Sequence, residues 1–248
     1  MPMPDGTLIF IAAVFAVAGF VKGAIGLGLP TIAMGLLAIV MPPVEAAAIL
    51  ILPSLLTNAW QMLAGPSLGA VTRRLWPMMI AVCLGTWSGV GLMAGTGARF
   101  GTVLLGAALA VYALTGLAAV RFAIPRDREP LLGPLAGAVT GAITAATGVF
   151  VIPAVPYLQA IGLEKEDLVQ ALGLSFTVST LALAINVAAS GALDVGIAGT
   201  TVVALVLACA GMWFGQVIRL KLSADIFRRC FFGGLLALGL YLALRALA

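Results

Sequence analysis

The chain has 248 residues, of which 62% are hydrophobic and 9% carry a charge, and it contains no histidine. An average soluble domain is about 25% charged, so nine acidic and 13 basic residues cannot cover the surface of a globule of this size. This composition excludes a soluble enzyme. The net charge of +4 does not indicate nucleic-acid binding, because the arginines stand at the ends of apolar stretches.

Apolar stretches account for most of the chain and predict an all-α polytopic membrane protein. In chain order they cover residues 7–41, 46–64, 75–95, 101–120, 131–162, 168–189, 195–217 and 227–247. The first residues lack the basic segment of a signal peptide, so we expect the first stretch to be a retained span.

The first and fifth stretches are too long for single spans, since a continuous helix of 35 residues would reach about 52 Å against a hydrocarbon core of about 30 Å. Both are interrupted by helix-breaking residues. The first contains Gly23, Gly26, Gly28 and Pro30, and the fifth contains Gly141, Gly148, Pro153 and Pro156. We predict that each forms a broken or re-entrant helical hairpin near the middle of the membrane.

One broken stretch followed by three ordinary spans occurs twice, which predicts repeats over residues 1–124 and 125–248. The segment Cys83-Leu-Gly85-Thr-Trp87-Ser-Gly89 recurs as Cys209-Ala-Gly211-Met-Trp213-Phe-Gly215, and residues 18–25 match residues 136–143. We expect the repeated cysteines and tryptophans to pack the same helix crossing in each half.

Charged residues indicate that the two repeats are inverted. Arg73 and Arg74 precede the third element of the first half, whereas its counterpart follows Asp194. After the third element the asymmetry reverses, with Arg219 and Arg228 in the second half. Since basic loops face the cytoplasm, we expect a multi-pass protein of the bacterial inner membrane with both termini in the periplasm.

Inverted repeats with discontinuous helices are typical of secondary transporters. A broken helix exposes unpaired N–H groups and a positive dipole end in a low-dielectric medium, which suits an anion. The alternative is that the glycines only permit tight helix crossings.

Lys22 is the single ionisable residue deep in an apolar stretch, next to the first glycine cluster. A charge buried in the membrane suggests function by default, and this cation would suit an anionic substrate. Its repeat counterpart is Thr140. The alternative is that Lys22 reaches water from the end of a short half-helix.

Neutral polar residues in the spans after the two broken stretches could line the same cavity, or could bond to their own helices. They are Ser54, Thr57, Asn58, Gln61, Gln170, Ser175, Thr177, Ser179, Thr180 and Asn186, of which Asn58, Gln61 and Thr177 are preferred. The complete predicted substrate site is Lys22, Gly23, Gly26, Gly28, Asn58, Gln61, Thr140, Gly141, Thr144, Thr147, Gly148, Ser175 and Thr177. We expect no catalytic residue, no metal site and no cofactor.

These features resemble the TauE/SafE family of sulfite exporters, whose repeats each open with a glycine-rich segment and continue to an A-x-x-x-S/T stretch. The residues that carry the resemblance are Gly19, Gly23, Gly26, Gly28, Pro30, Ala47 and Ser54 in the first copy, and Gly137, Gly141, Gly148, Pro153, Ala171, Ser175 and Thr177 in the second. The sequence departs from the family pattern in lacking its triple glycine, having Gly26-Leu27-Gly28-Leu29 and Thr147-Gly148 instead.

The resemblance implies export of a small sulfur-containing anion, such as sulfite, sulfoacetate or a related organosulfonate. We expect alternating access, with the two halves rocking around an anion held near the midplane. An anion channel using the same hairpins is the alternative. The expected partners are this anion and the lipid bilayer, with no nucleic acid, and the sequence leaves open whether two copies form a homodimer.

Overall fold

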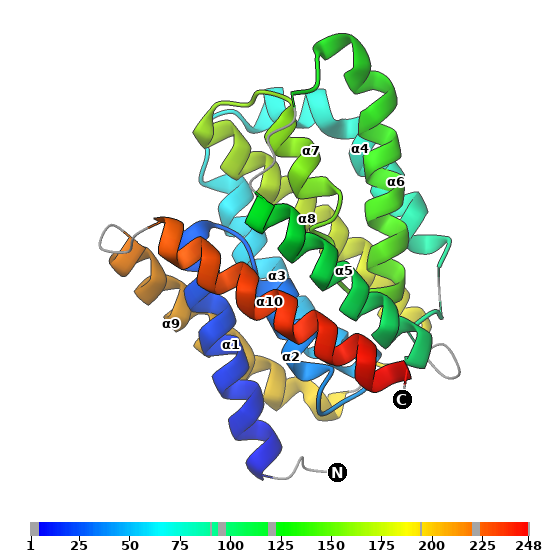
Figure 1. Cartoon of the computed structure of the whole chain (residues 1–248), viewed down its shortest axis with the longest axis vertical. Helices are drawn as coiled ribbons and strands as arrows, with labels where there is room; N and C mark the ends of the chain where they lie inside the picture. Colours follow the sequence, from blue (N-terminus) through cyan, green and yellow to red (C-terminus); the bar gives the residue numbers. More distant parts are fainter. Residues whose placement is uncertain are drawn as a thin grey trace.

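The computed structural model describes residues 5–89, 91–93, 98–118, 123–193, 195–219 and 224–247, and these residues form helices and no strand (Figure 1). The α-helices are α1 (Asp5–Ile25), α2 (Leu29–Leu37), α3 (Pro43–Leu63), α4 (Leu68–Trp87), α5 (Ala98–Ala118), α6 (Glu129–Thr147), α7 (Ala154–Ala160), α8 (Lys165–Ala189), α9 (Ala198–Ile218) and α10 (Ala224–Leu247). Short 3-10 turns, η2 (Arg126–Arg128) and η3 (Val195–Ile197), precede α6 and α9.

Within the described residues, seven helices are long and apolar enough to cross a membrane, namely α1, α3, α5, α6, α8, α9 and α10. The helix α4 is outside this set although it has 20 residues, and Arg73 and Arg74 in its first two turns lower its hydropathy. Asp194, which contributed to the predicted orientation, is outside the described residues. The chain is a multi-pass membrane protein.

The first apolar stretch is divided into α1 and α2 at its glycine cluster. Gly26 and Gly28 adopt φ angles of 80° and 108°, a left-handed conformation that other residues rarely adopt. The helix α1 before this break has 21 residues, so its length is about 30 Å, enough for a full crossing. The break therefore follows a helix long enough for a full crossing, and its depth near the middle of the membrane stays a prediction.

The fifth stretch divides in a similar way into α6 and α7. Gly148 caps the C-terminus of α6 with a φ of 69°, and its N–H donates to the Thr144 carbonyl over 2.8 Å. The Thr147 hydroxyl accepts from the Val149 N–H over 3.1 Å and thereby holds the first turn of the connecting segment. Phe150 then buries its ring against Phe176 of α8, with ring centroids 5.4 Å apart.

The helices pack mainly as four pairs, each joining the first half of the sequence to the second: α1 with α9, α4 with α6, α3 with α8, and α5 with α10. In Figure 1, α1 and α9 lie together at the lower left, and α4 and α6 lie together at the upper right. The short helix α2 is buried along nearly its whole length and contacts α1, α3, α5 and α10.

Glycines form the closest crossing, between α1 and α9. A Cβ added to Gly19 or Gly23 would overlap the backbone of Ala208 or Met212, and one added to Gly211 would overlap the backbone of Ala16. The contacts advance in the same direction along both chains, so α1 and α9 run parallel. Small residues that let two backbones approach are the usual means of packing helices in a membrane, where lipid tails remove the hydrophobic drive.

The pair α4 and α6 repeats this arrangement. An added Cβ at Gly137 or Gly141 would overlap the backbone of Met78 or Val82, again with both chains running in the same direction.

The expectation for the repeated cysteines and tryptophans was wrong, since glycines make both crossings. Trp213 is 67% exposed and Trp87 is 42% exposed, while Cys209 is exposed and Cys83 is partly exposed. Their exposed surfaces face away from the protein core.

Candidate functional site

Lys22 lies in the last turn of α1 and is buried, with an exposed fraction of 3%. Its ammonium donates a hydrogen bond to Oδ1 of Asn58 on α3. A side chain that reached water would be exposed, so the snorkelling alternative does not describe this conformation. A charge held inside a protein in this way needs polar partners, because removing an ion from water is costly.

Asn58 extends this contact into a chain of hydrogen bonds through the middle of the molecule. Its Nδ2 donates to Ser54 Oγ over 2.9 Å, and the Ser54 and Thr180 hydroxyl oxygens are 3.2 Å apart. Thr180 in turn donates to the Phe176 carbonyl over 2.6 Å. We call Lys22, Asn58, Ser54 and Thr180 the polar cluster. It joins α1 and α3 of the first half to α8 of the second, and Lys22 is its one ionisable side chain.

Some buried hydroxyls have no hydrogen-bond partner within the described part of the chain. Thr31 Oγ1 on α2 and the Ser175 and Ser179 Oγ atoms on α8 belong to this group. Most buried polar atoms in proteins are paired, so each exception needs an explanation such as a ligand or a water molecule. These hydroxyls can donate to an anion, because their hydrogens are not engaged elsewhere.

The predicted glycines of the site separate into two groups. Gly26 has open space around its Cα, and Gly28 lies against the side chains of Val21 and Phe231, so both remain candidates for lining a ligand. Gly23 and Gly141 instead face the backbones of α9 and α4, as the helix-crossing alternative proposed.

Gly148 lies against Met34, and this contact brings the second break next to α2. The residues around both breaks therefore meet α2, which is itself the second segment of the first broken stretch.

The predicted threonines donate to their own helices. Thr140, Thr144, Thr147 and Thr177 each bond to the carbonyl four residues earlier, over 2.7 Å in every case. Bonds of this kind satisfy a hydroxyl without any ligand. The structure does not connect these four residues to the polar cluster by hydrogen bonds among the described residues.

The predicted Gln61 is also engaged, since its amide donates to the Val169 carbonyl over 3.0 Å and ties α3 to α8. A second glutamine strengthens the same crossing. Gln170 donates to the carbonyls of Met62 and Gly65 and accepts from the Ser67 N–H. These amides hold the end of α3 against the start of α8.

Sequence reasoning did not prefer Ser54, Ser179 or Thr180 and did not consider Thr31. The spacing of Ser54 and Asn58 by four residues could have indicated that both lie on one helix face. Thr31 had a weaker signal, its place directly after the proline that opens α2. In the described ranges, no group of three histidine, cysteine, aspartate or glutamate side chains could hold a metal ion.

A family model described as sulfite exporter TauE/SafE matches residues 11–242, from α1 to α10. No curated protein and no solved structure matches the chain significantly. The family match covers both helix breaks, the polar cluster and all or most of each membrane-length helix in the described ranges. The chain therefore belongs to the TauE/SafE family of sulfite exporters, which are membrane transporters.

Proposed function

We propose that this protein exports a small sulfur-containing anion, namely sulfite, sulfoacetate or a related organosulfonate, by alternating access. The observation that carries the proposal is the burial of Lys22, whose amine is a cation when protonated. No carboxylate pairs with it among the described residues, whose ion pairs are Arg74–Glu129 and Arg228–Asp225. A bound anion would neutralise this charge inside the protein, where a neutral amide oxygen can only partly stabilise it.

The start of α2 supplies the other half of the proposed anion site. Gly28 caps this nine-residue helix without any side-chain hydrogen bond, so its first N–H groups need external acceptors. The positive end of the helix dipole has the same preference for an anion. Lys22 lies a few residues before this break, and the buried Thr31 hydroxyl lies just after it. Ser175 is the candidate donor from the second half.

The packing supports the proposal that residues 1–124 and 125–248 are inverted repeats. The first helix of each half packs parallel to the third full-length helix of the other half, as α1 with α9 and α6 with α4. Equivalent helices pair with each other in the remaining two contacts, α3 with α8 and α5 with α10. This reciprocity is expected of two repeats related by a two-fold axis in the membrane plane. In this proposal the pairs α1–α2 and α6–α7 are the two hairpins.

The orientation we propose places the loop before α4 and the start of α6 in the cytoplasm. Arg74 and Glu129 form a two-point ion pair with N–O distances of 2.8 and 2.6 Å, which holds these two segments at one end of the molecule. Arg73, Arg126 and Arg128 belong to the same segments, as the positive-inside rule requires. Both chain termini would then be periplasmic in a bacterial inner membrane. An inside-negative potential favours export of an anion by about 2.3 kcal/mol per charge per 100 mV.

The test is flux from proteoliposomes loaded with sulfite, sulfoacetate, sulfate or acetate. We expect saturable, counter-anion-stimulated flux of sulfite or sulfoacetate. Lys22→Met should remove it, while Lys165→Met, which deletes the same charge at an exposed position, should leave it unchanged. Full flux in Lys22→Met would exclude Lys22 from substrate binding. Ohmic single-channel currents would instead support an anion channel.

A further inference from the structure

Polar atoms without partners gather along one face of α8. Ser175, Ser179 and Asn186 all have a buried side-chain oxygen that makes no hydrogen bond among the described residues. Their spacings of four and eleven residues place them on one side of the helix, and Ser190 continues the same side. From Ser175 to Ser190 this face extends over about 22 Å, most of the thickness of a bilayer core.

The contrast with neighbouring residues on the same helix shows that helix geometry does not explain the unpaired atoms. Thr177 and Thr180 donate to their own helix over 2.7 and 2.6 Å. The Ser175 and Ser179 hydroxyls, with equivalent carbonyls available one turn earlier, do not. An unmade hydrogen bond is costly in a low-dielectric surrounding. A ligand or water molecule that binds and leaves therefore explains these atoms better than a permanent lack of partners.

Asn186 identifies one such partner. Its Nδ2 donates to the Thr86 carbonyl of α4 over 2.7 Å. Because that neighbour is an acceptor, the amide cannot be turned around, and Oδ1 is necessarily the unpaired atom. A carbonyl oxygen can only accept, so its partner must be a donor such as water.

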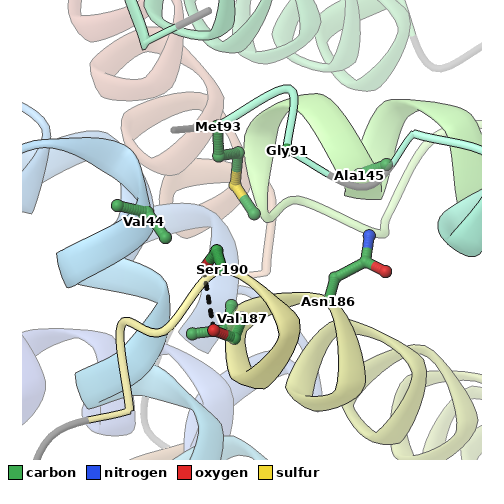
Figure 2. A pocket seen from close by; sticks show the side chains of 7 residues that line it. All are labelled: Val44, Gly91, Met93, Ala145, Asn186, Val187 and Ser190. Atoms are coloured by element: carbon green, nitrogen blue, oxygen red, sulfur yellow. Dashed lines mark hydrogen bonds between the residues drawn. The ribbon is translucent and has the colours of Figure 1, made fainter. Parts of the chain in front are cut away.

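A small cavity lies beside Asn186. It has a volume of about 10 Å³, enough for one water molecule. Figure 2 shows Asn186 and Ser190 on its wall together with Met93, Val44 and Ala145, so that α8, α3, α6 and the segment after α4 meet there. Ser190 donates to the Val187 carbonyl over 2.7 Å and leaves its oxygen free to accept.

We propose that the face of α8 formed by Ser175, Ser179, Asn186 and Ser190 is a hydrated path for the substrate anion, with water bound at Asn186. The Ser175 and Ser179 hydroxyls donate to the oxygens of a sulfonate or sulfite, and Asn186 accepts from a water molecule that accompanies the anion. In the conformation described here the path is narrowed to a single water site between Val44 and Met93. This inference rests on the proposed function, since it takes the transported anion as the ligand.

The test uses single cysteines on α8 in a background in which Cys83, Cys209 and Cys230 are replaced by alanine. Cysteines replace Ser179, Ala182 and Asn186 on the proposed path. Leu181→Cys and Ile185→Cys are matched controls at the same depths, because these two side chains are 48% and 54% exposed on the outer surface of the bundle. An anionic methanethiosulfonate reacts in water with thiolates and fails to react in lipid.

We expect the path cysteines in proteoliposomes to react about tenfold faster than the controls, because only they meet water. Sulfoacetate should slow the reaction of the path cysteines with the reagent. Sulfite is unsuitable as a protectant because it attacks the reagent. Path cysteines that react as slowly as the controls would overturn the inference, and so would rapid labelling that sulfoacetate does not slow. Ser179→Cys and Ala182→Cys are small changes and keep the test valid if Asn186→Cys fails to fold.

Sulfur-anion flux through the same proteoliposomes distinguishes failure of the hydrated path from failure of the proposed function. Normal sulfoacetate flux with unreactive path cysteines would overturn the hydrated path and leave the proposed function intact. Absent flux of every sulfur anion would overturn the proposed function, and the anion path with it, even where labelling is rapid.

Discussion

Replacement of Asn58 by leucine tests how the buried charge is stabilised. Asn58→Leu keeps the number and branching of the side-chain heavy atoms but removes the oxygen that accepts from Lys22 and the amide that donates to Ser54. A hydrogen bond to a charged group contributes about 1.5–3 kcal/mol and a neutral one about 1 kcal/mol. Removing one partner of a buried charge costs about 3–5 kcal/mol, because the charge remains without compensation. We therefore expect the free energy of unfolding to fall by about 3 kcal/mol.

The double variant Lys22→Met/Asn58→Leu shows whether the charge is the cause. With the ammonium gone, no ion is left unpaired, so the double variant should be more stable than Asn58→Leu by about 2 kcal/mol. The apparent melting temperature of the purified protein in detergent is the assay. A shift of about 2–4 °C per kcal/mol is expected for a chain of this size.

Equal melting temperatures for Asn58→Leu and the double variant would refute the reasoning, since they would mean that the Lys22 charge does not depend on Asn58. Lys22→Met alone supplies the third corner of the cycle. It should fold and melt near the parent temperature, because losing one desolvated ion offsets the Asn58 oxygen left without a donor.

Three further outcomes follow from the packing. Gly211→Ala should lower the melting temperature sharply, because the added Cβ would overlap the α1 backbone. Gly234→Ala on α10 has open space around it and should be neutral or stabilise the protein by about 0.5–1 kcal/mol. Similar melting temperatures for both variants would contradict the close crossing of α1 and α9. Arg74→Gln and Glu129→Gln should each lower the free energy of unfolding by about 1 kcal/mol, because the two side chains of this ion pair are only 24% and 13% exposed. Their effects should be non-additive in a double-mutant cycle. Strict additivity would show that the pair contributes nothing to stability. Gln170→Leu should lower the free energy of unfolding by about 2 kcal/mol, because the backbone groups at the end of α3 lose their hydrogen-bond partners. The measurements are the melting temperature and amide hydrogen exchange, which should become faster in residues 62–67. Unchanged exchange in these residues would disprove this role of Gln170.

The sequence predicted the helical membrane fold and the positions of both breaks because these depend on local properties. Hydropathy reports span length, and glycine next to proline reports where a helix ends. Both helices end at the predicted glycines: α1 ends at Ile25, directly before Gly26, and α6 ends at Thr147, directly before Gly148.

The site was harder to predict because it depends on which helices cross. Lys22 was identified from its charge alone and Asn58 from its amide, but their contact spans 36 positions of sequence. Gly23 and Gly141 resembled the lining of an anion site because composition cannot distinguish a glycine that faces a ligand from one that faces another backbone. Only the orientation of each helix about its axis decides this, and no local pattern in a helix apolar on most sides encodes it.

The glycine crossings also determine which parts of the protein can move as rigid bodies. Backbones in direct contact cannot slide past each other without creating voids or overlaps, so we expect α1 to move together with α9 and α4 together with α6. Each of these two helix pairs takes one helix from residues 1–124 and one from residues 125–248, so residues 1–124 alone would lack one helix of both pairs. The two helix pairs, α1–α9 and α4–α6, are connected through the crossing of α3 and α8, where Ser54 and Thr180 are in contact. An anion bound at this crossing would lie at the interface between two rigid bodies, where a small relative rotation changes its exposure to water the most.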